Sequence, residues 1–155
     1  MSPFATVSAV DTDQAIDSIN DSFDRLVIGA RRTIRRSAAA LAADLQPAAW
    51  PVFREVVRAE RVQVGAIVST LEMDKGAVSR YLKDLREHGL VESARDEHDA
   101  RIVWITATPV ARERVAELAA AQRGRMHEAL AGWSPDDIER FAELLDRFSR
   151  PAAVD

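Results

Sequence analysis

The sequence predicts a mainly helical fold with one small β-hairpin, on three observations. Apolar residues recur at three- and four-residue steps over most of the 155 residues, which is the spacing of helices with one buried face. Residues 90–108 instead form two short runs of strand-forming residues on either side of a charged turn. Gly and Pro are scarce, with 6 of each. We therefore expect four helices, a hairpin and two further helices.

The first predicted helix runs from about Asp13 to Ala43, after an N-terminal arm, and either Asp11 or Thr12 can cap its start. It would span roughly 45 Å at 1.5 Å per residue, which is longer than a small domain is wide. We therefore expect part of its apolar stripe to pack against another chain. The stripe comprises Ile16, Ile19, Phe23, Leu26, Val27, Ala30, Ile34, Ala38 and Leu41.

Two shorter helices follow. One opens near Gln46, with Pro47 in its first turn, and we expect its inward residues to be Trp50, Phe53, Val56 and Val57. Residues 62–73 predict a short third helix carrying Ile67, Val68 and Leu71.

The fourth helix has a clear start and a clear end. Asp74 can accept hydrogen bonds from the free amides of the first turn, and Gly89 can adopt the left-handed conformation that ends a helix. Its predicted buried stripe is Val78, Leu82 and Leu85.

The hairpin and the last two helices complete the pattern. Residues 90–95 and 101–108 predict two antiparallel strands around a polar turn. Helical spacing resumes over residues 108–133, and Ser134 and Pro135 are typical of the start of a last helix over residues 134–148.

Composition excludes several classes of protein. Cysteine is absent, so neither disulfides nor thiolate metal sites are expected. No apolar run approaches the roughly 20 residues of a membrane helix and the N-terminus does not resemble a signal peptide, so we expect a cytoplasmic protein. A net charge of −4 argues against a protein that coats nucleic acid indiscriminately.

A short helix, a tight turn, a helix ending in glycine and a hairpin with a charged tip are the order of a winged helix-turn-helix. The exposed face of the fourth helix would carry Lys75, Gly76, Ser79, Arg80 and Lys83. Arg80 could donate to guanine, Ser79 could reach a base or a phosphate, and the two lysines could neutralise phosphates. Residues 74–101 hold six basic and seven acidic side chains, so an ordinary solvated helix face is the alternative.

Nearly the whole chain resembles MarR-type transcriptional regulators. The stretches that carry the resemblance are "LQPAAWPVFREVV", "VGAIVSTLEMDKGAVSRYLKDLREHGLVE", "RDEHDARIVWITATP" and "WSPDDIERFAELLDRF". The most specific is the wing pattern Asp96-x-x-Asp99-x-Arg101. The resemblance implies that Asp99 helps to hold the wing while Arg101 approaches the minor groove, and we include Arg95 among the DNA-binding residues.

The chain departs from the family pattern at three places. Gly76 and Ala77 stand where many relatives have hydroxyl residues early in the recognition helix. Glu72 occupies a turn position that is often glycine, and Ala111 replaces the usual glycine after the wing.

The resemblance also implies a homodimer in which the first helix and the last two helices interleave. The chain then divides into an arm and dimerisation helix (1–45), a winged helix-turn-helix lobe (46–108) and C-terminal dimerisation helices (109–155), which form one continuous domain. A two-fold dimer would read a pseudo-palindromic operator with half-sites about 10 bp apart, most simply as a repressor. The alternative is a winged-helix dimer without specific DNA binding that serves as a protein-interaction or small-molecule-binding module.

Relatives often respond to small aromatic or anionic effectors, which implies a ligand site here. The candidates are Phe23, Trp50, Phe53 and Arg54, which would supply apolar walls and one cation. Aromatic residues at this spacing are also typical of a plain core.

No cofactor, metal site or catalytic set is predicted. His88, His98 and His127 show no spacing typical of metal ligands. No phosphate-binding glycine loop or nucleophile elbow occurs, so we do not expect an enzyme.

Overall fold

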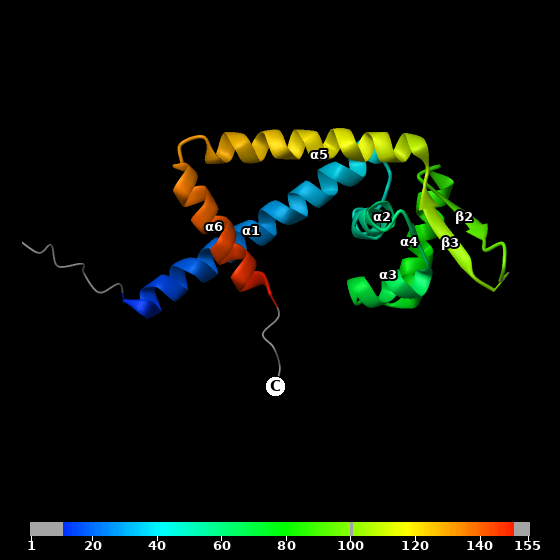
Figure 1. Ribbon diagram of the computed structural model, residues 1–155, viewed down its shortest axis with the longest axis horizontal. Coiled ribbons are helices and arrows are strands. Elements are labelled where there is room, and N and C mark those ends of the chain that lie inside the picture. The colour runs from blue at the N-terminus through cyan, green and yellow to red at the C-terminus, as the bar shows by residue number, and fades with distance from the viewer. Residues whose placement is uncertain (1–10, 100, 151–155) are drawn as a thin grey trace, which may run out of the picture. The chain divides into compact units, whose positions relative to one another are not determined.

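The computed structural model describes residues 11–99 and 101–150. The predicted order of helices and hairpin is confirmed (Figure 1). One short strand, β1, is added to it. The elements are α1 (Thr12–Leu41), α2 (Ala49–Arg58), β1 (Arg61–Val62), α3 (Val64–Leu71), α4 (Lys75–Glu87), β2 (Val91–Arg95), β3 (Val103–Ala107), α5 (Pro109–Leu130) and α6 (Pro135–Ser149). The predicted N-terminal arm before Asp11 lies outside the described residues.

The chain divides into two compact units, Met1–Arg112 and Glu113–Asp155, with the boundary inside α5. The three-part division expected from the sequence stays a prediction. In the described part of the chain, no helix is both long and apolar enough to cross a membrane.

Helix α1 starts where the sequence predicts. The Asp11 side chain accepts a hydrogen bond from the Asp13 amide at 3.1 Å and so caps the first turn. Near its other end α1 buries Ser37, Ala38 and Leu41, where it packs on α2. The earlier part of the helix remains more exposed.

The start of α2 differs from the prediction, because the helix begins at Ala49 and not near Gln46. The Ala49 amide donates to the Gln46 carbonyl at 2.9 Å and the Trp50 amide to the Pro47 carbonyl at 3.1 Å, so a tight turn precedes the helix. Pro51 instead falls in the first turn, where its missing N–H removes no helical hydrogen bond. Trp50, Phe53 and Val56 are buried as predicted, whereas Val57 is only half-buried.

Helices α3 and α4 form the helix-turn-helix. Glu72 ends α3 with φ 50° and ψ 39°, the left-handed conformation that glycine adopts most easily. Asp74 then caps α4 by accepting from the Ala77 amide at 2.8 Å, as predicted. Gly89, with φ +65°, follows the helix and turns the chain into β2.

The sheet has three antiparallel strands in the order β1-β3-β2. Strands β2 and β3 are the predicted hairpin, with Val91 opposite Ala107 and Arg95 opposite Val103. The sequence did not predict β1, because two residues are too few to show an alternating pattern. Arg61 pairs with Thr106 and Val62 with Ile105, so β1 ties the hairpin to the segment after α2.

The core gathers side chains from α2, α3, α4 and the base of the hairpin. Val78, Leu82 and Leu85 of α4 are at most 1% exposed, which confirms the predicted buried stripe. Arg112 closes the same unit by donating to the Glu60 carbonyl at 3.0 Å and the Ala107 carbonyl at 3.2 Å. The fully buried large side chains are Phe53, Ile67, Leu82, Leu85, Leu90, Val52, Val56 and Val78.

Candidate nucleic-acid interface

The exposed face of α4 is set by its buried stripe. Because Val78, Leu82 and Leu85 point into the core, the residues on the opposite side of the helix face solvent. All five α4 residues named from the sequence are exposed, namely Lys75, Gly76, Ser79, Arg80 and Lys83. The structure thus brings together two lysines, an arginine and a hydroxyl along one short helix.

Gly76 fits tightly beside the cap of α4. A Cβ atom at this position would lie 3.1 Å from Asp74 Oδ2, the oxygen that accepts from the Ala77 amide. Any larger side chain would require the capping carboxylate to shift. A side chain at this position is therefore less easily accommodated beside the cap than glycine.

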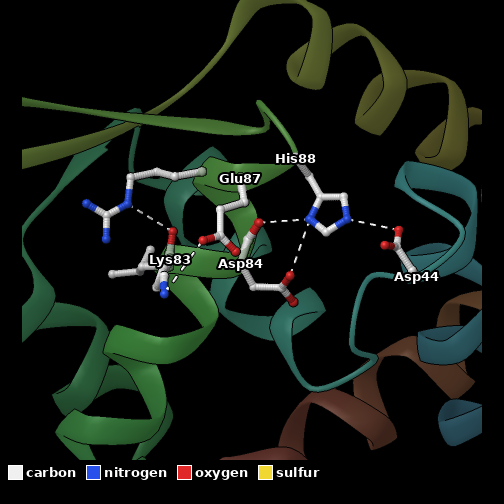
Figure 2. A network of polar contacts seen from close by, with 7 residues as sticks. Asp44, Lys83, Asp84, Glu87 and His88 are labelled. Atoms are coloured by element: carbon white, nitrogen blue, oxygen red, sulfur yellow. Dashed lines mark hydrogen bonds and ion pairs between the residues drawn. The ribbon is translucent and has the colours of Figure 1, made fainter.

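Lys83 has one acidic neighbour on the same helix. Its Nζ lies 3.7 Å from Glu87 Oε1, and both side chains are more than 60% exposed (Figure 2). An exposed pair of this kind contributes about 0–1 kcal/mol. Lys83 can therefore leave Glu87 for a phosphate at little cost.

The wing comprises β2, β3 and the turn between them, and Asp96 organises the start of that turn. Its Oδ1 accepts from the amides of His98 at 2.9 Å and Asp99 at 3.2 Å, and its Oδ2 accepts from the Trp104 indole N–H at 2.8 Å. The Trp104 hydrogen bond, followed by those from the amides, lowers the pKa of Asp96. The carboxylate is thus kept charged by the contacts that hold the turn.

Asp99 makes fewer of these contacts than Asp96. Its side chain accepts one hydrogen bond, from the Arg101 amide at 2.9 Å. Asp96 therefore carries much of the holding role that the family pattern assigns to Asp99. The candidate wing residues Arg95, Asp99 and Arg101 are all exposed.

Two contributors to the wing were missed from the sequence. The Arg61 guanidinium carbon lies 4.2 Å from the centroid of the Trp104 ring, a cation–π contact between β1 and β3. Trp104 was recognised only as a strand former, and Arg61 lies in the strand that was not predicted. A tryptophan a few residues after an Asx-type turn was the available signal.

The four ligand-site candidates occupy different environments. Trp50 and Phe53 are buried, with ring centroids 6.2 Å apart, while Arg54 is exposed. Phe23 is half-buried and lies 15 residues before Ala38, or roughly 22 Å along α1. Trp50 and Phe53 thus form part of the core, and a ligand site at these residues stays a prediction.

His88 lies between two carboxyl-bearing residues (Figure 2). Its Nδ1 is 2.8 Å from the Asp84 carbonyl and 3.3 Å from Asp84 Oδ1, and its Nε2 is 2.9 Å from Asp44 Oδ1. These hydrogen bonds, that of the Asp84 carbonyl first, raise the pKa of His88, and the contact with His88 lowers the pKa of Asp44. The histidine thus ties the end of α4 to the segment after α1.

The sequence did not predict the contacts of His88. The four-residue spacing of Asp84 and His88 places both on one helix face and was visible in the sequence, whereas the contact with Asp44 was not. Among the described residues, no group of three His, Asp or Glu side chains is placed to hold a metal ion.

Comparison with known proteins connects this geometry to a family. The model of the MarR family matches residues 43–102. Over 89 residues, 57% of this chain, the sequence is 28% identical to the uncharacterised HTH-type transcriptional regulator YdgJ of Bacillus subtilis. It is 32% identical over the same length to the HTH-type transcriptional regulator PetP of Rhodobacter capsulatus. The match spans about half of each of these relatives, 54% of their length.

Solved structures extend the similarity in fold. FabT of Streptococcus pneumoniae, solved in complex with DNA, is similar over 89% of this chain and 94% of its own, with a TM-score of 0.71 and 18% identity. The residues that match the family model include α2, the helix-turn-helix, β2 and the whole wing turn. Residues 43–102 therefore match the MarR family, and the fold of most of the chain is that of the solved winged helix-turn-helix structure.

Proposed function

We propose that the protein is a sequence-specific DNA-binding transcriptional regulator that acts as a homodimeric repressor. The observation that carries this proposal is the exposed face of α4, the second helix of the helix-turn-helix. It presents Ser79 and Arg80 between Lys75 and Lys83. A helix of this kind fits the major groove, where an arginine can donate two hydrogen bonds to one guanine and lysines can neutralise phosphates.

The wing supplies the second part of the proposed interface. Arg95 ends β2, and Arg101 lies in the wing turn, which the Asp96 and Asp99 side chains hold by hydrogen bonds. We assign to Arg101 an approach to the minor groove beside the site of α4, since arginine suits the negative potential there. The charge of the whole chain is negative, so binding depends on how cations are sorted onto this face.

Exposed apolar side chains support the proposed dimer. On α1, Ile16, Ile19 and Val27 are 48–49% exposed and Leu26 is 60% exposed, although they continue the stripe that buries Ala38 and Leu41. On α6, Leu144 is 40% exposed and Phe148 is 65% exposed. A second copy of the chain would cover such surfaces, and its two-fold symmetry would match a pseudo-palindromic operator.

Repression follows from the simplest use of such a dimer, which is to occlude a promoter. We include in the proposal release by a small aromatic or anionic effector, on the resemblance to the family. Benzoate is a suitable first probe, because it combines an aromatic ring with one negative charge. A rise in melting temperature and a loss of operator affinity with benzoate would support this part of the proposal. The absence of both would leave a regulator without response to this ligand class.

Fluorescence anisotropy tests specific binding directly. The protein is titrated with the duplex upstream of its own gene and with a scrambled duplex, over a series of salt concentrations. We expect a preference of at least about 10³-fold and a salt slope that indicates several phosphate contacts. Equal weak binding to both duplexes and to fragments selected from the genome would contradict the proposal. It would favour instead a dimeric module without specific DNA binding.

Two substitutions on α4 separate base reading from phosphate binding. Arg80→Ala should cost about 1–3 kcal/mol on the preferred duplex and relax specificity, because a base contact is lost. Lys83→Ala should weaken both duplexes alike and reduce the salt slope by about one. Unchanged specificity in Arg80→Ala would remove Arg80 from base reading.

A further inference from the structure

We propose that Arg61 and Trp104 are positioning residues for DNA binding, which hold the wing turn through Asp96 without contacting DNA themselves. The inference rests on the proposed function, because it assigns a role within the same interface. It concerns a series of side-chain contacts in which Arg61 of β1 lies over Trp104 of the central strand β3, and Trp104 donates to Asp96 in the turn after β2.

The first link fixes Arg61. Glu60 before it has φ 60°, and the Glu60 carbonyl accepts from Arg112 Nη2 at 3.0 Å. Arg61 then pairs with Thr106 on β3, which is two residues from Trp104 and therefore on the same face of the sheet. The backbone of β1 is thus held by Arg112 and by pairing with β3, and this places the Arg61 guanidinium over the Trp104 ring.

The second link connects Trp104 with the turn. Trp104 is half-buried, and its indole N–H has one geometrically defined acceptor, Asp96 Oδ2 at 2.8 Å. The ring therefore receives a cation on its face and directs its only donor at the carboxylate. Arg61 also adds an attractive charge near Asp96, which contributes to the lowered pKa of that carboxyl.

The third link is the turn itself. Asp96 uses its other oxygen to accept from the amides of His98 and Asp99, and Asp99 accepts from the Arg101 amide. The backbone amides of His98 and Asp99 are thus held by a carboxylate that Trp104 orients. Loss of the indole donor should allow Asp96 to rotate and the turn to open more often, which would disperse the orientations of Arg101.

The chemistry of the side chains provides matched variants. Trp104→Phe keeps an aromatic face for Arg61 and removes the N–H donor. Arg61→Lys keeps a cation over the ring, whereas Arg61→Leu removes it. Trp133→Phe makes the same change in a tryptophan of the other unit and serves as the control for amide exchange.

Each variant is measured in two ways, by anisotropy on the preferred duplex over a salt series and by NMR exchange of the His98 and Asp99 amides without DNA. For Trp104→Phe we expect amide exchange about fivefold faster, affinity lower by roughly three- to tenfold and an unchanged salt slope. Arg61→Leu should show the same pattern with smaller changes, and Arg61→Lys should restore most of the affinity. Trp133→Phe should match the wild type in amide exchange.

Three outcomes would overturn the inference. Unchanged amide exchange in Trp104→Phe would show that the network does not hold the turn, whatever the DNA result. Faster exchange with unchanged affinity would show that the turn is held without consequence for binding. A salt slope lower by about one in Arg61→Leu would make Arg61 a direct phosphate contact. If the wild-type protein prefers no duplex, the proposed function fails instead, and the amide exchange still reports separately on the network.

Discussion

The winged lobe and helix α6 bury their apolar side chains to very different extents. Phe53, Ile67 and Leu85 of the lobe are fully buried. In α6 the apolar side chains of Phe141, Leu144 and Leu145 are 40–44% exposed, and no residue is classed as buried. Helix α4 of the lobe and helix α6 each begin with a side-chain cap, so the difference lies in packing. The lobe completes its own core, whereas α6 presents a face that is suited to a partner chain.

The largest effect should come from the core of the lobe. Phe53→Ala should lower the free energy of unfolding by about 3–5 kcal/mol, because it removes a fully buried ring and leaves a cavity. Urea unfolding followed by circular dichroism measures this change. The result also separates two interpretations of Phe53. A stable variant that loses only effector binding would make this residue part of a ligand site.

The exposed stripes should control assembly more than folding. Leu26→Glu and Leu145→Glu place charges on side chains that are 60% and 44% exposed, so the helices should persist while the dimer weakens at least tenfold. Sedimentation velocity over a range of concentrations measures the change. Ser18→Glu is the control, because Ser18 is exposed on the opposite side of α1 from the apolar stripe. An unchanged sedimentation coefficient in both variants would contradict a dimer through these faces.

A smaller effect is expected at the turn of the helix-turn-helix. Glu72→Gly should raise the free energy of unfolding by about 0.5–1 kcal/mol, because glycine adopts the left-handed conformation without the cost of a Cβ atom. Ala66→Gly, at an exposed position inside α3, should instead be destabilising by about 1 kcal/mol. If Glu72→Gly is destabilising, the glutamate side chain contributes more than its backbone conformation costs.

The smallest effect should be a dependence of stability on pH around His88. The pKa of His88 is raised above 6.5 in the folded protein. The contribution of protonated His88 to the free energy of unfolding is therefore fully present below pH 6.5 and is lost as pH rises through the folded pKa. The lowered pKa of Asp44 has its effect in the acidic range, where stability falls as pH drops below 3.8. His88→Gln should therefore flatten the neutral-to-alkaline part of the profile.

Urea unfolding at steps from about pH 6 to about pH 8.5 measures this dependence. His98→Gln is the control, since His98 is exposed in the wing turn. An identical pH profile in wild type and His88→Gln would show that the contacts with Asp44 and Asp84 do not stabilise the protonated histidine.

Much of the fold could be predicted from the sequence because its signals are local. Ser134 caps α6 by accepting from the Asp137 amide at 3.1 Å, and the cap forms between residues only three apart. The start of α2 was harder to predict, because either Pro47 or Pro51 could lie in the first turn of the helix. In the structure the Gln46 and Pro47 carbonyls accept hydrogen bonds of a tight turn, so Pro51 is the proline in the first turn of α2. The exposed α4 face was predictable as a consequence of its buried stripe.

The sequence by itself determined the order of the helices, the caps of α1, α4 and α6, the hairpin and the exposure of Lys75, Ser79, Arg80 and Lys83 on α4. These depend on backbone preferences and on side chains within about one turn of each other. Only the tertiary structure decided that Arg61 covers Trp104 and that Asp44 reaches His88. Those partners are more than 40 residues apart in the chain, and the packing of β1 and of the segment after α1 brings them together. Contacts of that kind have no local pattern, because the folded backbone alone sets the distance between the groups.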